Sequence, residues 1–280
     1  PNVGDQQFRR SDNGSILKNP FAGNYIMDDF TTNTGIEVMF RHNGFLLLGG
    51  INSGTLKPAL AATTGTGENK KYVERNLVDE LAYVWKASID RQITDKFRIR
   101  ASLAGSHQPE TLSGSLHSGD RTGSRYYLVM NKQAGDGSEF DITKNFTSGN
   151  FGPGSFTKDN TLTANLFAKY AGLEFFGTFQ NASGKNLTNA EYAFNQLALE
   201  AIYRFGKQED FYIGGRYNTV NNTKSSPEMS VERMQLAAGW FITPNVGLKL
   251  EYVDQDYKNF ANYGESAGFK GMMLEAGISF

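Results

Sequence analysis

Apolar and polar side chains alternate one by one along most of this chain. In the last such segment Met272, Leu274, Ala276, Ile278 and Phe280 are apolar, and polar or small residues lie between them. Successive side chains of a β-strand point to opposite faces, so this period of two predicts a strand with one apolar face and one polar face. The same alternation occurs at 33–41, 44–53, 81–90, 97–103, 165–170, 173–180, 196–205, 211–218, 233–240 and 246–252.

The length of these segments favours a membrane barrel over a soluble β-sandwich, in which the apolar face would simply be the core. The segments run to roughly ten residues, the length that a tilted strand needs to cross a bilayer, whereas soluble strands average about five or six. Aromatic residues lie near the segment ends, where girdles form at the membrane surface. The aromatic residues expected there are Tyr170, Tyr203, Phe205, Trp240, Tyr252 and Phe280. The sequence therefore predicts an all-β fold, a transmembrane antiparallel up-and-down β-barrel.

The connections between the segments alternate between short and long. The short ones lie at 42–44, 91–95, 171–172, 206–210 and 243–245, and the long ones at 55–77, 106–160, 182–194, 221–230 and 256–267. Bacterial barrels have short periplasmic turns and longer extracellular loops. We therefore expect the long connections outside the cell and Phe280 at the periplasmic rim.

The number of segments sets a constraint on the barrel. Bacterial single-chain barrels have an even number of strands and both termini in the periplasm, whereas the segments above number eleven. We expect about 12–16 strands in total, with one or more N-terminal strands missing from this chain. Residues 1–32 would then be the end of an extracellular loop, and 1–280 a single barrel domain.

The stretch 106–160 is longer than ordinary connections, which suggests a structure or function of its own. Ser124–Met130 is typical of a strand, which could pair near Glu139–Ile142 in an extracellular hairpin. The stretch could fold inward as a constriction or plug, or stand out as a partner surface. The sequence leaves both open.

Composition excludes several other classes of protein. Apolar residues make up 39% of the chain, but none of their runs approaches the ~20 residues of a transmembrane helix. The net charge of −1 gives no electrostatic reason to expect a nucleic-acid partner. Because the chain has no cysteine, thiolate metal sites and disulfides are excluded.

Two features resemble known outer-membrane proteins. The C-terminal strand ending in Phe280 resembles their assembly signal. The stretches Tyr170–Gln180 (YAGLEFFGTFQ), Glu200–Gly206 (EAIYRFG) and Phe211–Val220 (FYIGGRYNTV) resemble porin-type barrels of Bacteroidota, akin to the porin O/P group. This resemblance implies an outer-membrane location and solute diffusion, and it transfers no specific site residue.

The polar face of the predicted strands carries charges of both signs. The basic residues expected in the lumen are Arg41, Lys86, Arg98, Arg100, Lys169, Arg204, Arg216, Arg233 and Lys249, and the acidic ones are Glu37, Asp90, Glu174, Glu200, Glu251 and Glu275. Such charges either line a channel or pair across a closed lumen. In an open channel their cationic excess favours anions, and Arg98 and Arg100, which share one strand face, are the best candidates for an anion-attracting patch.

Catalysis and metal binding have little support. The stretch 117–125 faintly resembles the His–Ser region of outer-membrane phospholipases, but it lacks their flanking motifs, and a loop rich in Gly and Ser is a poor platform for a nucleophile. The histidines His42, His107 and His117 lack ligand spacing. The Asn- and Asp-rich stretch 131–141 lacks an EF-hand pattern and is typical of a solvated loop. We expect no catalytic residue, metal or cofactor.

Two functions remain. The first is a porin-like channel in the outer membrane, in contact with its lipid, that passes small hydrophilic solutes with a bias to anions. The second is a non-conducting barrel that is a structural or accessory subunit of an outer-membrane assembly or secretion complex, with other outer-membrane proteins as partners.

Overall fold

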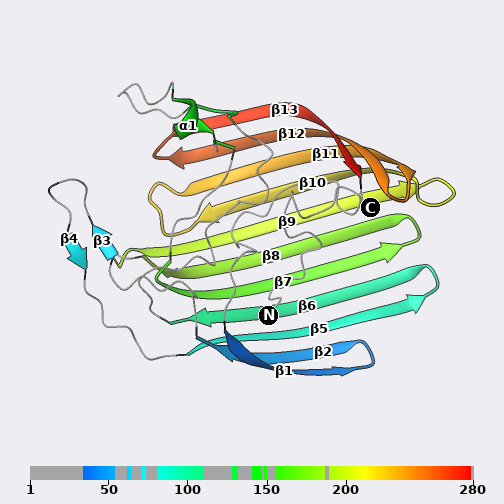
Figure 1. The fold of residues 1–280 in the computed structure, drawn as a ribbon, viewed down its shortest axis with the longest axis horizontal. Helices are drawn as coiled ribbons and strands as arrows, with labels where there is room; N and C mark the ends of the chain where they lie inside the picture. Colours follow the sequence, from blue (N-terminus) through cyan, green and yellow to red (C-terminus); the bar gives the residue numbers. More distant parts are fainter. Residues whose placement is uncertain are drawn as a thin grey trace.

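The computed structural model describes residues 34–53, 62–64, 68, 71–73, 81–109, 128–131, 141–146, 148–149, 156–186 and 189–278. Its main feature is one antiparallel sheet of eleven strands, in which each strand pairs with the next along the chain (Figure 1). In order these are β1 (Gly35–His42), β2 (Phe45–Asn52), β5 (Ala82–Thr94), β6 (Phe97–Gln108), β7 (Lys158–Tyr170), β8 (Leu173–Lys185), β9 (Glu191–Phe205), β10 (Phe211–Asn222), β11 (Met229–Thr243), β12 (Val246–Phe260) and β13 (Gly264–Ile278).

Two small elements lie outside this sheet. The strands β3 (Ala62–Thr64) and β4 (Lys71–Val73) pair with each other, and α1 (Ile142–Asn145) is a single helical turn. No helix among the described residues is long and apolar enough to span a membrane. The eleven-stranded, up-and-down sheet confirms the predicted all-β class and the predicted number of segments.

The strands run between two ends of the sheet, which we call the turn end and the loop end. The connections at the turn end are 43–44, 95–96, 171–172, 206–210 and 244–245, and those at the loop end are 53–81, 109–157, 186–190, 223–228 and 261–263. The turn end agrees with the predicted short connections. At the loop end the expected lengths were wrong, because strands continue into 182–194, 221–230 and 256–267 and into both ends of 106–160.

Strands are longer than a membrane requires. The four strands β9, β11, β12 and β13 have 15 residues each, whereas about 9–11 tilted residues cross a bilayer. On β12 the outward side chains are apolar from Val246 to Tyr252 and polar from Asp254 to Lys258. The inward side chains change in the opposite sense, from Lys249 and Glu251 to Tyr257. The apolar face therefore switches from outside to inside part-way along the strand.

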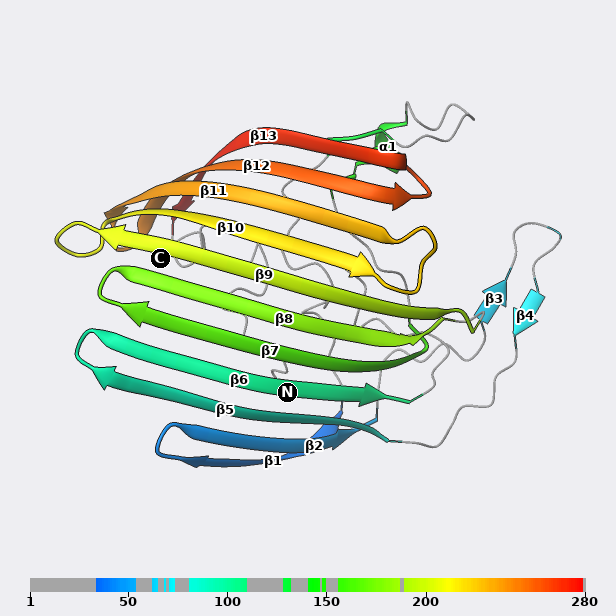
Figure 2. The same cartoon turned by 180° about the vertical axis from the view of Figure 1, so that it is seen from behind.

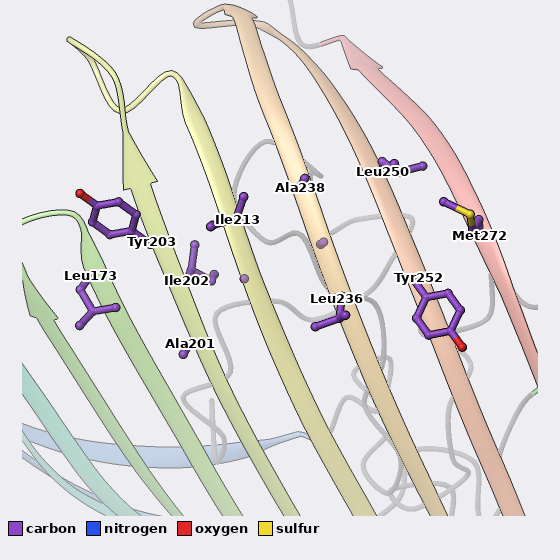
Figure 3. Close-up of a pocket in the computed structure, with 12 residues that line it drawn as sticks. Leu173, Ala201, Ile202, Tyr203, Ile213, Leu236, Ala238, Leu250, Tyr252 and Met272 are labelled. Carbon is purple, nitrogen blue, oxygen red and sulfur yellow. The ribbon is translucent and has the colours of Figure 1, made fainter.

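The outer face at the turn end forms a continuous apolar belt. It contains, for example, Leu236 on β11 and Leu250 on β12, which are 52% and 43% exposed. Side chains from β8 to β13 also border an apolar depression of about 550 Å³ in this belt (Figure 3). Figure 2 shows the sheet from behind, with its strands in order from β13 at the top to β1 at the bottom. An exposed apolar belt of this kind is stable against lipid and costly in water.

Aromatic side chains border the belt on its turn side. The Phe211 ring lies 5.6 Å from that of Phe205 and 5.9 Å from that of Trp240, and Phe205 stacks on Tyr203 at 5.9 Å between ring centres. Tyr170, the other aromatic residue expected here, also ends its strand at a turn and contacts the ring of Phe97.

Tyr252 lies at the other border of the belt, where its hydroxyl is 3.5 Å from Asp254 Oδ2. Phe280 lies outside the described residues.

Inside the loop end, an apolar cluster joins the sheet to the connection between β6 and β7. Phe156, from that connection, packs against Phe194 of β9 at 6.0 Å between ring centres, and Met130 belongs to the same cluster. The Tyr263 hydroxyl, whose pKa is raised by burial, donates a hydrogen bond of 3.2 Å to the Ser148 carbonyl. Met130, Ser148 and Phe156 of this connection thus pack against the inner face of the sheet, one of the two arrangements that the sequence left open, whereas Ile142 of α1 is 63% exposed.

The hairpin expected within that connection is absent at its described residues. Ile142 begins the helix α1, which Asp141 caps by accepting a hydrogen bond of 2.8 Å from the Thr143 N–H, and it does not belong to a strand. Leu128 donates its backbone N–H to the Phe146 carbonyl at 2.9 Å. The remaining residues of the expected hairpin, 124–127 and 139–140, lie outside the described residues.

The two edges of the sheet are β1 and β13. Because eleven strands alternate in direction, both run from the loop end to the turn end, and they cannot pair with each other in an antiparallel ladder. Antiparallel closure needs an odd number of further strands between them. Totals of 12, 14 or 16 strands satisfy this condition. The expected total of 12–16 strands stays a prediction.

Candidate functional site

The side chains that could meet a solute lie on the inner face of the sheet. All ten charged residues that were the predicted lumen and selectivity positions have inward register positions: Lys86 on β5, Arg98 and Arg100 on β6, Glu174 on β8, Glu200 and Arg204 on β9, Arg216 on β10, Arg233 on β11, and Lys249 and Glu251 on β12. Alternation with the exposed apolar positions places them there. Nine of them, all but Lys86, form three groups.

The first group lies at the turn end, on β7, β8 and β9. Glu174 accepts hydrogen bonds of 3.1 Å from both Lys169 Nζ and Arg204 Nε. Lys169 also contacts Glu209 Oε2 at 2.9 Å, which ties the turn at 206–210 to the strands. Glu174, Arg204 and Glu209 border a polar pocket of about 480 Å³ together with Phe241. An alternating chain of charges such as this holds its members in place while it stays in contact with water.

The second group lies on β11, β12 and β13. Lys249 Nζ contacts Glu251 Oε2 at 2.7 Å and Glu275 Oε2 at 3.3 Å, and Gln235 donates a hydrogen bond of 2.8 Å to Glu251. The side chains of Lys249 and Glu251 are only 2% and 1% exposed. Buried charges are tolerated only when they are paired and hydrogen-bonded, as they are here.

A neighbouring pair extends this group toward the middle of the inner face. Arg216 lies 3.8 Å from Glu200 and donates hydrogen bonds of 3.2 and 3.1 Å to Asn218 Oδ1. Arg233, on the next strand, donates to Gln255, which in turn donates to the Tyr257 hydroxyl. These contacts fix the direction of each guanidinium group.

The third group includes the predicted anion-attracting patch. Arg98 makes a bidentate pair with Asp90, with N–O distances of 2.9 and 2.6 Å. Asp90 is also the direct cross-strand partner of Arg100. Asp90, Arg98 and Arg100 therefore lie together on the inner face, and this group of three has a net charge of +1.

A glycine makes room for the turn-end group. Gly239 is the cross-strand partner of Tyr212, and a Cβ atom at residue 239 would overlap the Tyr212 ring. The ring can therefore lie flat across the inner face, where the Arg204 guanidinium is 5.7 Å from its centre and Phe241 packs beside it. The place of the Tyr212 ring thus depends on the absence of a side chain at the inward residue Gly239.

Sequence reasoning missed two kinds of residue in the site. Glu209 lies in a turn, where the period of two carries no signal, and only its contact with Lys169 brings it into the site. The inward amides Gln180, Gln196 and Asn218 follow the alternation of their strands, but sequence reasoning assigned them no role. The pattern of side chains does not show which amide atoms are hydrogen-bonded and which are not.

Metal-binding side chains are dispersed. No group of three or more His, Asp or Glu side chains that could hold a metal ion occurs in the described part of the chain. His107 hydrogen-bonds Asn160 at 2.7 Å and stacks on Tyr83, and His42 ends β1. His117 lies outside the described residues.

Comparison with known proteins was informative only at the level of structure. No protein-family model matches the chain, and no curated protein matches its sequence. Among solved structures, the anion-selective porin from Comamonas acidovorans is similar with a TM-score of 0.54 and 12% identity, over 95% of this chain and 67% of that porin. The chain has the fold of a porin-like outer-membrane β-barrel.

Other outer-membrane proteins match this barrel less well. OmpT of Vibrio cholerae, as a loop L8 deletion mutant, has a TM-score of 0.43 and 8% identity over 91% of this chain and 74% of OmpT. OccAB2 of Acinetobacter baumannii has a TM-score of 0.42 and 10% identity over 92% and 71% of the two chains.

Proposed function

We propose that this porin-like barrel forms a channel in the bacterial outer membrane through which small hydrophilic solutes diffuse passively, without catalysis or a cofactor. The observation that carries this proposal is that the outer face of the sheet is apolar and the inner face is charged at the same height. At the height of the apolar belt, where Leu236 and Leu250 face lipid, the inner face carries Arg216, Glu200 and Lys249. A wall that is apolar outside and charged inside suits a water-filled lumen.

The charge balance beside the belt supports a preference for anions. The basic side chains at inner positions there are Arg41, Lys86, Arg98, Arg100, Lys169, Arg204, Arg216, Arg233 and Lys249, and the acidic ones are Glu37, Asp90, Glu174, Glu200, Glu251 and Glu275. Ion pairing fixes these groups but leaves the basic excess in place. Rings of charge of one sign raise the local concentration of the opposite ion in a pore.

Conductance in a planar lipid bilayer tests the proposal. The purified protein should give stable current steps in KCl, and a salt gradient should give a reversal potential on the anion-selective side. A folded protein, shown by its heat-dependent mobility in gel electrophoresis, that gives no current steps would contradict the channel function. Steps with cation selectivity would contradict only the anion preference.

A second function, a non-conducting accessory barrel, has one observation in its favour. Several inner side chains are almost fully buried, among them Arg233 at 1%, Gln235 at 0% and Gln255 at 0% exposed. A filled inner surface suits a structural subunit of an outer-membrane complex. In that case bilayers stay silent, and mild detergent extraction recovers the barrel together with other outer-membrane proteins.

A further inference from the structure

An uncharged polar zone lies between the charged groups at the turn end and the apolar cluster at the loop end. It occupies two adjacent cross-strand rows on the inner face of β7, β8, β9 and β10. The members of this amide zone are Thr163, Asn165, Thr178, Gln180, Gln196 and Asn218, each at most 6% exposed. Because the zone carries no charge, hydrogen bonding determines what it can bind.

Part of the hydrogen-bonding capacity of the amide zone is used internally. Gln180 Nε2 donates to Thr163 Oγ1 at 3.2 Å, and Thr178 Oγ1 donates to Asn165 Oδ1 at 2.8 Å. Asn218 Oδ1 accepts the two hydrogen bonds from Arg216. These bonds fix the orientation of the Gln180 and Asn218 amides and therefore decide which of their atoms remain available.

Three buried atoms of the zone have no hydrogen-bond partner: Gln180 Oε1, Gln196 Oε1 and Asn218 Nδ2. Gln180 and Gln196 are direct cross-strand partners, and Asn218 lies diagonally from Gln196 on the next strand. An unpaired buried polar atom destabilises a fold, so three of them in adjacent positions favour a site that a bound ligand completes. The zone thus presents two acceptors and one donor close together.

We propose that the amide zone is a binding site for an uncharged, hydroxyl-rich solute, a sugar or polyol, on its way through the channel. A hydroxyl group both donates and accepts, so it can serve the two glutamine oxygens and the asparagine nitrogen. A carboxylate or phosphate offers only acceptors to the glutamine oxygens, and an ammonium group offers only donors to the asparagine nitrogen. Arg233, the cross-strand partner of Asn218, is directed to Gln255. The proposal rests on the channel function and adds the class of its solute.

The test measures block of the KCl current by glucose in planar bilayers, using the full chain. Polyethylene glycol of the same hydrodynamic size is the control solute, because its chain accepts but hardly donates hydrogen bonds. The variants are Gln196→Met, which keeps length and removes the orphaned acceptor, and the double variant Gln180→Met/Gln196→Met. Gln208→Met, in an exposed part of the 206–210 turn, is the matched control.

The expected result is a glucose block in the wild type that exceeds the effect of polyethylene glycol. Gln196→Met should weaken this block by about two- to tenfold, the equivalent of one hydrogen bond, and Gln208→Met should leave it unchanged. A KCl conductance equal to that of the wild type shows that each variant is folded.

Two results would overturn the inference. If glucose and polyethylene glycol reduce the current equally, or if glucose blocks Gln196→Met as strongly as the wild type, the orphaned atoms bind only water. The channel function still stands in that case. If the wild type gives no current at all, the channel function fails and the solute site fails with it.

Discussion

The ring of Tyr212 lies across the backbone of Gly239 on the neighbouring strand, in the space that a side chain at residue 239 would occupy. Tyr212 is only 2% exposed there, and it joins Arg204 to Phe241 at the turn end of the inner face. An aromatic ring that covers a glycine on the next strand shields the exposed backbone and fixes the register of the pair.

Replacing Gly239 with Ala should destabilise the barrel, because the new methyl group overlaps the Tyr212 ring and one of the two must move. Overpacking of this kind costs about 1–3 kcal/mol in the free energy of unfolding. Urea titration of the protein folded in lipid vesicles measures it. Gly271→Ala is the control, since nothing lies within 4 Å of a Cβ atom at that inward position. Equal costs for the two variants would show that Tyr212 does not depend on Gly239.

Leu236→Arg should be far more costly than Thr219→Arg, although both residues are on the outer face. Leu236 lies within the apolar belt, and Thr219 lies beyond it, two positions past Tyr217. An arginine that faces lipid near the bilayer midplane costs about 2–4 kcal/mol, and the cost falls toward zero near the surface. Folding yield and urea stability in vesicles measure the difference. Similar stabilities would place the membrane elsewhere on the barrel.

Asp90→Asn should increase the preference for anions. Asp90 accepts both hydrogen bonds of the Arg98 guanidinium, so its removal raises the net charge of the group with Arg100 from +1 to +2. The reversal potential in a KCl gradient measures the change. The control Asp256→Asn removes the same charge from the outer face beyond the belt and should leave the potential unchanged. An unchanged reversal potential on Asp90→Asn would mean that this group does not face the ion path.

Phe156→Ala should release the connection between β6 and β7 from the inner face. Phe156 is 2% exposed and packs against Phe194 and Tyr192, so truncation removes the main aromatic contact of that connection with β9. Limited proteolysis should then cut within 109–157 several-fold faster while the strands resist, and the conductance should rise. Phe146→Ala, at a residue that is 50% exposed, is the control. Unchanged cleavage would mean that other contacts hold the connection.

The sequence predicted the strands and their faces correctly within the apolar belt. Alternation of large apolar residues with polar ones, as in Val246 to Tyr252, has a single explanation when lipid is outside and water inside. The alternation predicted the eleven strands of this sheet, the connections at the turn end, and the inward placement of charges such as Arg204 and Lys249. The aromatic residues Tyr203 and Trp240 marked the turn side of the belt for the same reason.

Beyond the belt the sequence misled us about where strands end. On β12 the outward residues Asp254 and Asp256 are polar and the inward residues Val253 and Tyr257 are apolar, so the apolar phase shifts by one residue. A shift of phase resembles the end of a strand when only the sequence is available. The physical reason is that the outside of this part faces water, and its inside packs against the connection between β6 and β7.

The sequence by itself determined the class of fold, the direction of each strand and the face of each side chain within the apolar belt, because these depend on a local period of two and on the contrast between lipid and water. Only the tertiary structure decided which charges meet, such as Lys169 with Glu209, and which amide atoms remain without a partner, such as Gln196 Oε1. Those contacts join residues on different strands, and they depend on register and on side-chain direction, which no local pattern specifies.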